Sequence, residues 1–550
     1  MYIKYAAQLA NHLKSKIFCE GENGMELFPL TLPKSNICME TALYYRSSRP
    51  VQYDEHMGRI IFGKKTTLTF DTYFNCFSYQ KYLQYTGAHV LEAHLQLQGE
   101  VQMRLMKVEL SGKKVQRTVL LTQTVMHQTM DTAVLLYDFG KESGNGMLYL
   151  ELTALSKTVV FSGGFYASPM AESELQPVKI AAVICTYKRE EYVQRNLCNL
   201  QETVLAQPQA EIARHLEVFV VDNGQTLRRD EVESPGIRLF PNKNLGGSGG
   251  FTRGIIEALR RKEEFSHVLL MDDDILLESN VLVKTVRFLQ IVRSEHQDLA
   301  IGGSMLRLDD MAVQHEAGGK WTGRKIVNLN KGFNLCNVSD LLKNEIDNHP
   351  DYNAWWYACL PLCLIDENNL PLPLFVREDD AEYGFRLFCK WLLLNGVGVW
   401  HPPFDKKNNP IMEYYNTRNQ LILNAIHYPN NPIYKNLYIL LRFSGKCLLK
   451  HNGQMIQIPF KGFEDYLKGP VWLKRQDSLR LHQALVSYQK ELETKGKKTL
   501  LFYWVMAGIL FGKSCICLLL QYPKVVEQYQ SQLKVLTSID FWCEKLEIEH

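Results

Sequence analysis

Three consecutive aspartates, Asp272, Asp273 and Asp274, end an apolar segment that begins at His267. The four apolar residues after His267 are typical of a strand buried on both faces, and open α/β sheets place their ligands at the carboxyl ends of such strands. In extended backbone the side chains of Asp272 and Asp274 point the same way, and that of Asp273 points elsewhere. Because carboxylates suit hard cations, the spacing predicts a Mg2+ or Mn2+ site. A solvated acidic turn is the alternative.

Two other predicted strands end in residues that could contact a nucleotide. The segment Thr186 to Arg189 places a hydroxyl and two cations beside a helix N-terminus, which suits a base and phosphates. Asp222 ends the next strand and could accept hydrogen bonds from a nucleobase or ribose, although a strand-terminating Asp-Asn-Gly turn is the simpler interpretation. Asn242 to Gly254 is glycine-rich but matches neither a Walker loop nor a Rossmann fingerprint. Its glycines permit close backbone approach.

Three regions of different pattern surround these motifs. Residues 25–170 alternate in short runs separated by Gly, Ser and Asn turns, which predicts an antiparallel β-sandwich. From residue 178, buried strands alternate with helical stretches, which predicts a βαβ nucleotide-binding half, and after residue 411 the pattern is helical. The expected elements are strands at 66–70, 101–110, 148–155, 178–185 and 217–221, and helices at 190–203, 252–262, 381–391, 414–428 and 476–494.

The composition narrows the class of protein. The chain of 550 residues is too long for one core and suggests about three domains. A hydrophobic fraction of 46% excludes extensive disorder, and a net charge of +3 is too small for nucleic acid to be the main partner. The 13 cysteines lack Cys-x-x-Cys spacing, so we expect reduced, buried thiols in a cytoplasmic protein. The N-terminal segment lacks the apolar core of a signal peptide, so we expect no export.

An apolar segment, Leu500 to Leu520, lies near the C-terminus and is interrupted by a Gly-Lys-Ser sequence at Lys513. A spanning helix needs about 20 apolar residues, and a lysine at the midpoint is unfavourable in a membrane. We therefore expect a buried helix, or one that lies on a membrane surface, rather than a transmembrane helix. The flanking lysines that would suit an anionic leaflet are Lys495, Lys497, Lys498 and Lys524.

The order of the motifs resembles the nucleotide-sugar half of family 2 glycosyltransferases of the GT-A fold. Downstream, residues 351–357, 373–384 and 398–402 are similar to bacterial galactofuranosyltransferases of the polymerising type, which build mycobacterial galactan. The resemblance implies a jelly-roll-like antiparallel β-sandwich in residues 1–175 and a Rossmann-like α/β GT-A catalytic domain in residues 176–410. It implies a helical, membrane-associated domain in residues 411–550.

The resemblance also implies roles for individual residues. Asp272 and Asp274 would bind the metal, with His401 as a third ligand from the far side of the site. Asp380 would be the general base that takes a proton from the acceptor hydroxyl, and Asp379 would hold the acceptor or neighbouring groups. The implied nucleotide-sugar contacts are Thr186, Arg189, Asp222, Asn244 and Asp273, and the implied sugar and acceptor contacts are Glu316, Trp355, Trp356 and Arg377.

The chain departs from the family's pattern at two places. Arg377 and Glu378 stand where Lys-Trp is common, a change that affects the acceptor contacts more than the chemistry. Cys185 and Lys188 stand where proline and asparagine are more usual, which affects the nucleotide contacts.

Each implied role also has a structural alternative. Asp379 and Asp380 could start a helix, because acidic residues favour a first turn. His401 could be a buried, hydrogen-bonded core histidine. A tryptophan pair is more often core than carbohydrate platform, yet Trp355 and Trp356 cannot both face one core if the backbone is extended, so we expect one of them to be exposed.

The expected function is that of an inverting, metal-dependent glycosyltransferase. It would transfer galactofuranose from UDP-galactofuranose to a hydroxyl of a lipid-linked cell-surface glycan, with Mn2+ or Mg2+ as cofactor. We expect it on the inner face of the plasma membrane as a peripheral protein, and a homo-oligomer is an open alternative because the family includes oligomers. Two other functions stay open: transfer from another donor, such as dTDP-rhamnose or a UDP-hexose, and noncatalytic carbohydrate binding by the sandwich.

Overall fold

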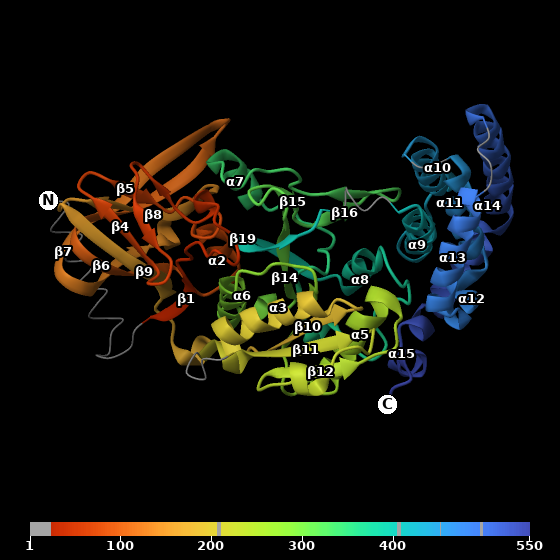
Figure 1. Ribbon diagram of the computed structural model, residues 1–550, viewed down its shortest axis with the longest axis horizontal. Coiled ribbons are helices and arrows are strands. Elements are labelled where there is room, and N and C mark those ends of the chain that lie inside the picture. The colour runs from red at the N-terminus through yellow and green to blue at the C-terminus, as the bar shows by residue number, and fades with distance from the viewer. Residues whose placement is uncertain (1–23, 206–210, 404–408, 451–452, 495–498, 550) are drawn as a thin grey trace.

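The computed structural model describes residues 24–205, 211–403, 409–450, 453–494 and 499–549. The N-terminal segment, Lys495, Lys497 and Lys498 lie outside the described residues, so the expectations that rest on them stay predictions. Figure 1 shows three parts in a row: an N-terminal part rich in strands, a central sheet with helices packed against it, and a set of C-terminal helices.

An antiparallel sheet of nine strands forms the N-terminal part, coloured red to orange in Figure 1. Its long strand β6 (Val90–Ser111) pairs with β7 (Lys114–Asp138), β8 (Gly146–Ala154) and β9 (Thr158–Ser168). The predicted antiparallel β-fold is confirmed, and its strands belong to one hydrogen-bonded sheet. The other elements here are β1 (Met25–Pro29), β2 (Arg46–Ser47), β3 (Gln52–Asp54), β4 (Arg59–Gly63), β5 (Thr67–Thr69) and helix α2 (Tyr79–Tyr85).

The central sheet has eight strands in the order β12-β11-β10-β13-β18-β14-β15, and β19 pairs with β14. Strands β10 to β13 are parallel, so their carboxyl ends meet at one edge, where Thr186 lies opposite Asp222 and Cys185 lies opposite Asp272. The mixed, mostly parallel sheet expected for a GT-A domain is confirmed. Its strands are β10 (Ile180–Thr186), β11 (Leu216–Asp222), β12 (Ile237–Pro241), β13 (His267–Asp272), β14 (Leu299–Arg307), β15 (Gln314–Glu316), β18 (Ala358–Pro361) and β19 (Lys390–His401).

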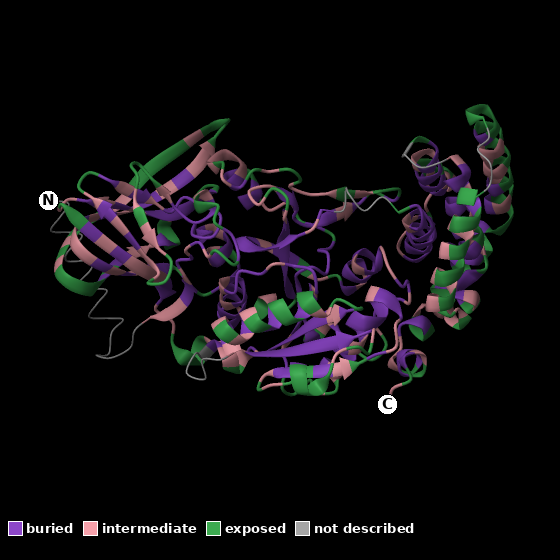
Figure 2. Cartoon of the chain, viewed as in Figure 1, coloured by how far each residue is buried: buried purple, intermediate pink, exposed green. Residues whose placement is uncertain are grey.

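Continuous apolar sequences explain why these strands lie inside the molecule. Nearly every residue of β10, β11 and β13 is buried, and the inner strands of the sheet are mostly purple in Figure 2. Parallel strands covered on both faces have this composition. The central helices are α3 (Glu190–Leu200), α4 (Arg229–Val232), α5 (Gly246–Leu259), α6 (Asn280–Gln290), α7 (Val338–Glu345) and α8 (Asp379–Leu387), and a small hairpin is formed by β16 (Gly319–Trp321) and β17 (Ile326–Asn328).

Two central helices differ from their predicted bounds. Helix α5 begins at Gly246, so most of the glycine-rich segment is helical rather than a loop. Its glycines let the helix pack closely on β10, because a Cβ atom on Gly250 would lie 2.1 Å from Cys185 Sγ. Helix α8 ends at Leu387, where Phe388 has a left-handed φ of 50°. The predicted helix over 381–391 is therefore too long.

Strand β19 is supported by the N-terminal part. Tyr73 Oη donates a hydrogen bond to the Val397 carbonyl at 3.1 Å, and Lys81 Nζ donates to the Leu393 carbonyl at 2.7 Å. The first contact is buried and the second partly buried, and a buried hydrogen bond left unmade would be costly. The N-terminal sheet thus helps to fix the strand that ends at His401.

The C-terminal part is entirely helical in its described residues, as predicted. Helix α15 returns to the central part, where Trp542 Nε1 donates to the Pro371 carbonyl at 2.8 Å. Every cysteine in the described residues is free, but the expectation that they are buried is wrong for most of them, since Cys198 and Cys363 are exposed and five others are only partly buried. The helices are α9 (Ile411–His427), α10 (Ile433–Lys450), α11 (Gln457–Leu467), α12 (Gly469–Arg475), α13 (Ser478–Thr494), α14 (Leu500–Leu536) and α15 (Ile539–Leu546).

Helix α14 is continuous through the Gly-Lys-Ser sequence, and its apolar half stands largely free of the protein. By length and composition it could cross a membrane, yet only 17% of its apolar window is buried. The expectation of a buried helix is therefore wrong, because no other described element covers this surface. The exposed apolar side chains are Leu500, Leu501, Phe502, Trp504, Val505, Ile509, Ile516, Leu519 and Leu520.

Candidate active site

Asp272, Asp274 and His401 form one cluster at the carboxyl end of the central sheet. Asp272 is the last residue of β13, and His401 is the last residue of β19. His401 Nε2 lies 2.9 Å from Asp274 Oδ1 and 3.7 Å from Asp272 Oδ2. One ligand atom from each of the three residues lies within 4.8 Å of the other two. Two carboxylates and one imidazole at these separations fit a divalent cation such as Mn2+ or Mg2+.

The electrostatics of this cluster also favour a bound cation. Burial raises the pKa of Asp272 to about 7; His401 lowers it, and the charge of Asp274 raises it further. Burial lowers the pKa of His401, but its hydrogen bond with Asp274 and the charge of Asp272 raise it by more. His401 Nδ1 lies 2.7 Å from the Pro402 carbonyl, which favours a proton on Nδ1 and leaves Nε2 facing the carboxylates. A cation there would relieve the repulsion between the carboxylates.

Strand β13 ends at Asp272, so Asp273 and Asp274 lie in a turn rather than in the extended backbone that the predicted alternation assumed, yet Asp273 has partners of its own. Its carboxylate accepts hydrogen bonds from Thr186 Oγ1 and Arg189 Nη1, both at 2.8 Å. The same Arg189 nitrogen lies 2.9 Å from Asp274 Oδ2. Thr186 is buried, whereas the Arg189 side chain is 42% exposed. The structure thus brings three predicted nucleotide contacts together, with Arg189 the one most open to a ligand.

The other two predicted nucleotide contacts are Asp222, the last residue of β11, and Asn244, in the loop before α5. Asp222 is buried, and its two carboxylate oxygens accept hydrogen bonds from the backbone N–H groups of Gly224, Thr226 and Leu227 at 2.7–2.8 Å. This is the strand-terminating turn that the sequence offered as the simpler interpretation. Asn244 is half-buried, and its Oδ1 accepts from the Gly246 N–H at 3.0 Å. Their contacts with a nucleotide stay predictions.

Asp379 and Asp380 begin helix α8, so the structural alternative for this pair is present. Asp379 Oδ2 accepts a hydrogen bond from Ser248 Oγ at 3.1 Å, and Asp380 Oδ1 accepts from the Ala381 N–H at 2.8 Å. Burial raises the pKa of Asp379 to about 7, and the charge of Asp380 adds to this. Burial raises the pKa of Asp380 to about 6. A carboxylate with this pKa can accept a proton near neutral pH.

Electrostatic coupling places Glu316 and Arg377 in the same site as Asp380. Burial raises the pKa of Glu316 to about 8, and the charge of Asp380 raises it further. Arg377 lowers the pKa of Asp380, whereas Asp272 raises it. Asp380 therefore lies within electrostatic reach of Asp272 in the candidate metal cluster, of Glu316 and of Arg377. Buried Tyr352 shares this environment, since burial and the charges of Asp380 and Glu316 raise its pKa.

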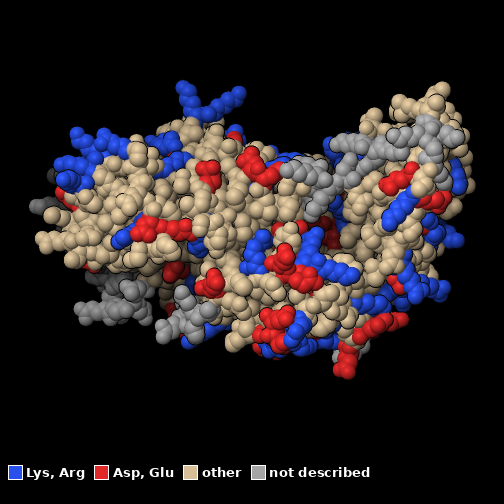
Figure 3. Space-filling view, in the orientation of Figure 1, with Lys and Arg blue, Asp and Glu red and all other residues tan. Residues whose placement is uncertain are grey.

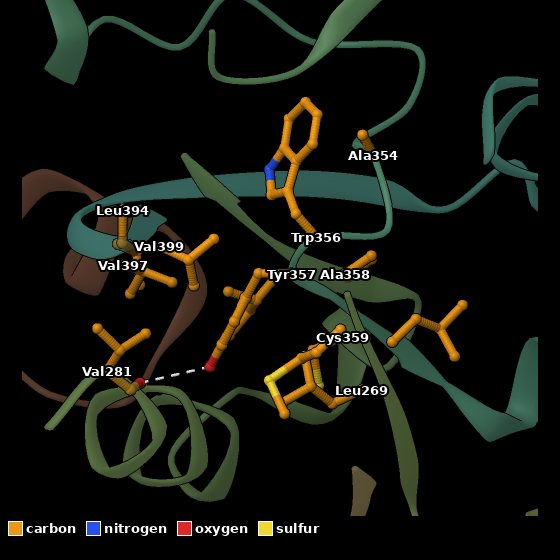
Figure 4. Close-up of a cluster of buried hydrophobic side chains, with 14 of the residues drawn as sticks. Leu269, Val281, Ala354, Trp356, Tyr357, Ala358, Cys359, Leu394, Val397 and Val399 are labelled. Carbon is orange, nitrogen blue, oxygen red and sulfur yellow. Dashed lines mark hydrogen bonds between the residues drawn. The ribbon is translucent and has the colours of Figure 1, made fainter. Parts of the chain in front are cut away.

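The expectation that Trp355 or Trp356 is exposed is wrong, because both are buried. They lie in a turn rather than in extended backbone, so their rings need not alternate. Trp355 packs edge-on against Phe251 with ring centroids 5.1 Å apart, and Trp356 Nε1 donates to the Gly303 carbonyl at 2.9 Å. Figure 4 shows Trp356 and Tyr357 pointing to opposite sides of the chain. Contact of either tryptophan with an acceptor stays a prediction.

Two site residues were missed by the sequence analysis. Ser248 binds Asp379 from the first turn of α5, and Asn196 Nδ2 donates to the Asp273 carbonyl at 2.9 Å from α3. Asn196 is a buried amide on the inner face of a helix, and buried polar groups need partners. That inward position was the available signal. For Ser248 the only signal was its place among the glycines.

Comparison with known proteins gives a family for the central segment. Residues 177–315 match the family described as "Glycosyltransferase like family 2". Galactofuranosyltransferase GlfT2 of Mycobacterium tuberculosis (strain ATCC 25618 / H37Rv) is 27% identical over 440 residues, covering 74% of this chain and 66% of that protein. GlfT2 of Mycolicibacterium smegmatis is 26% identical over 439 residues, covering 74% and 65%. The chain therefore resembles these enzymes but spans slightly less than two thirds of their length.

A solved structure is also similar to part of the chain. Mannosyltransferase PcManGT from Pyrobaculum calidifontis, in complex with GDP-Man and Mn2+, aligns with 62% of this chain and 88% of its own. The identity is 12% and the TM-score is 0.29, which is too low to carry an argument.

Proposed function

We propose that this chain, whose residues 177–315 match the family 2 glycosyltransferases, is an inverting, metal-dependent glycosyltransferase. Its proposed donor is UDP-galactofuranose, and its proposed acceptor is a hydroxyl of a lipid-linked cell-surface glycan. The likeness to the two GlfT2 galactofuranosyltransferases supports the donor. The observation that carries the proposal is the Asp272, Asp274 and His401 cluster, which lies within electrostatic reach of Asp380.

The chemistry of the proposed reaction matches these residue types. Asp272, Asp274 and His401 would hold a divalent cation, and a cation there stabilises the negative charge of a diphosphate leaving group. The acceptor oxygen forms a bond to the anomeric carbon while the bond from that carbon to the diphosphate breaks. Asp380 takes the hydroxyl proton. A single displacement of this kind inverts the anomeric centre and needs no covalent enzyme intermediate.

Glu316 and Arg377 would bind the sugars in this scheme. Because burial raises the pKa of Glu316 to about 8, its carboxyl is largely protonated at pH 7 and can donate a hydrogen bond to a sugar oxygen. Arg377 is half-buried beside the Asp380 carboxylate and offers cationic donors. Trp355 and Trp356 would act from below the surface by shaping the acceptor pocket.

The first test is calorimetric titration of UDP into the full chain with and without Mn2+. We expect binding that requires Mn2+ and that is lost in Asp272→Ala and Asp274→Ala, because each removes a carboxylate from the cluster. The exposed Asp310→Ala is the matched control and should bind as the parent does. No UDP binding under any condition, together with glycan binding, would favour the noncatalytic carbohydrate-binding function.

A panel of nucleotide sugars then tests the donor. Transfer from UDP-galactofuranose above all other donors is the expected result. Transfer from dTDP-rhamnose or a UDP-hexose, with none from UDP-galactofuranose, would support the proposed glycosyltransferase activity but assign it a different donor.

We propose that the protein acts at the cytoplasmic face of the plasma membrane, held by helix α14. The free half of α14 exposes aliphatic and aromatic side chains, and in Figure 3 the upper tip at that end of the molecule is uncharged, with charged side chains below it. Lys513 lies within this half and is 68% exposed, which favours a helix on the membrane surface over one that crosses it. A lipid-linked acceptor would lie at the same surface.

A further inference from the structure

The five residues before the Asp379-Asp380 pair have an unusual backbone. Phe375, Arg377 and Glu378 have φ angles of 75°, 70° and 58°, in the left-handed region that side chains other than glycine avoid. Such residues persist only where the surroundings hold them, and they cluster at functional sites. The segment 374–378 therefore needs specific contacts to keep its shape.

Helix α9 supplies most of these contacts through one asparagine. Asn419 Nδ2 donates to the carbonyl oxygens of Val376 and Arg377, both at 2.9 Å, and lies 3.4 Å from that of Leu374. Asn419 is fully buried, and its Oδ1 accepts from Arg418 Nε at 2.9 Å. Arg418 Nη2 donates to the Leu374 carbonyl at 2.7 Å. The amide and the guanidinium thus bind one side of the segment.

Helix α5 binds the opposite side. The Ser248 N–H lies 3.4 Å from the Phe375 carbonyl, and the Ser248 hydroxyl donates to Asp379. A Cβ atom on Gly246 would lie 2.0 Å from the Phe375 oxygen, so only glycine allows this approach. The four carbonyl groups from Leu374 to Arg377 are therefore all bound, that of Phe375 by α5 and the other three by α9, and the next belongs to helix α8.

Glu378 adds a side-chain contact to α9. Gln420 Nε2 donates to Glu378 Oε1 at 2.8 Å, while Glu378 Oε2 and Gln420 Oε1 are buried without a donor. A proton on Glu378 would supply that donor. Burial raises the pKa of Glu378 to about 8, which favours the neutral acid at pH 7. A neutral Glu378 can pair with the Gln420 amide through two hydrogen bonds.

We propose that Arg418, Asn419 and Gln420 of helix α9 form a clamp that fixes the segment 374–378 and thereby positions Asp379 and Asp380. These are positioning residues, because they touch neither the substrates nor the reacting atoms. The clamp comes from the C-terminal helical part, so that part completes the site in the central part. Its effect on catalysis rests on the proposed function, whereas its effect on the backbone does not.

The test compares Asn419→Ala with Asn436→Ala in the full chain. Asn436 is a matched control, because it is an equally buried asparagine that accepts a hydrogen bond from Asn424 and lies on α10, away from the segment. Hydrogen exchange of peptides covering residues 372–382 reports the backbone, and transfer kinetics report the chemistry. In Asn419→Ala we expect exchange in this region to rise at least about tenfold and kcat to fall about tenfold to a hundredfold. Donor KM and Mn2+-dependent UDP binding should stay within about twofold.

Glu378 variants give a second measurement that is independent of overall folding. Glu378→Gln keeps the shape of the neutral acid and should retain kcat within about threefold, whereas Glu378→Ala should lose about tenfold. Parental exchange and kcat in Asn419→Ala would overturn the clamp. Equal loosening in both asparagine variants would also overturn it, since the effect would then be general. Loosening confined to Asn419→Ala, in a protein that transfers no sugar, would support the clamp and refute the proposed function.

Discussion

At the scale of single residues, neighbouring carboxylates differ because their partners differ. Asp272 and Asp274 converge on His401, while Asp273 between them is occupied by Thr186 and Arg189. The turn that begins after Asp272, rather than alternation along extended backbone, separates Asp273 from the other two. In the acidic run that begins α8, Ser248 binds one carboxylate and Gln420 another. The contacts that each carboxylate makes, rather than its place in the sequence, therefore determine its role.

Removing the proposed base should affect kcat selectively. We expect Asp380→Asn to lower kcat by about 10²- to 10⁴-fold, because an amide cannot take the acceptor proton, while UDP binding is retained. Steady-state kinetics and UDP titration measure the two effects. Asp131→Asn, at a carboxylate that is 67% exposed on the N-terminal hairpin, is the control. A full loss of UDP binding in Asp380→Asn would instead place Asp380 in the donor site.

The pH dependence of kcat gives a second prediction for Asp380. Burial raises its pKa to about 6, so the protonated, inactive form accumulates as pH falls through about 6. We therefore expect kcat to decline on the acid side of pH 6 and to level off above pH 7. Because Arg377 lowers the pKa of Asp380, Arg377→Gln should move this acid-side decline of kcat to higher pH. An acid-side decline at the same pH in Arg377→Gln and in the parent would show that another group controls the rate.

At the scale of elements, three helices fix the backbone around the site. From α3, Arg195 Nη2 donates to the Ile275 carbonyl at 2.6 Å and Asn199 Nδ2 donates to the Leu277 carbonyl at 2.9 Å, which fixes the chain after the aspartates. Helices α5 and α9 enclose the segment before α8. These contacts join residues far apart in the sequence, so each helix acts through tertiary packing rather than through its own capping.

A side chain at Gly246, where α5 lies close to the segment 374–378, should lower both stability and catalytic rate. Gly246 has φ of +72°, and its Cβ in Gly246→Ala would meet the Phe375 oxygen at 2.0 Å. We expect backbone strain to lower the free energy of unfolding by about 1–3 kcal/mol and kcat to fall about tenfold. Thermal unfolding and kinetics measure these effects. Gly445→Ala in α10 is the control, because its Cβ meets nothing within 4 Å, and it should stabilise its helix by up to about 1 kcal/mol.

At the scale of the whole molecule, the N-terminal and C-terminal parts each hold in place an element of the site in the central part. The N-terminal sheet holds β19, which carries His401, and the C-terminal helices hold the segment before Asp379. Helix α14 itself contacts α9, since Gln530 Nε2 donates to the Ala425 carbonyl at 2.8 Å. The helix proposed to meet the membrane is therefore packed against the helix that holds the site.

Sedimentation with anionic phospholipid vesicles tests the proposed membrane surface. We expect the parent to sediment with vesicles and the triple variant Leu501→Gln, Ile509→Gln, Leu520→Gln to stay in the supernatant, because these side chains are 69–76% exposed. The control replaces the exposed Met57 and Met126 of the N-terminal part with glutamine. Extraction of the parent by alkaline carbonate would confirm a surface helix, and resistance to it would favour a spanning one.

Local sequence patterns determined the framework of the central part. The apolar runs before Thr186, Asp222 and Asp272 gave strands β10, β11 and β13 at nearly their observed bounds, because continuous burial constrains every residue of such a strand. Parallel packing then requires their carboxyl ends to meet. Asp272 and Asp274 followed from that reasoning alone, while His401 came only through the family resemblance.

The tertiary structure alone decided which surfaces meet. Periodicity showed that 414–428 is a helix, but nothing local showed that Asn419 binds carbonyl groups more than 40 residues earlier. The same limit explains the error on Trp355 and Trp356, which a turn buries together, and explains why the sequence left open whether α14 is buried or lies on a membrane surface. Sequence periodicity indicates the secondary structure and the side chains that are favoured to be buried. Which partner buries a side chain, or whether any does, depends on contacts between distant segments.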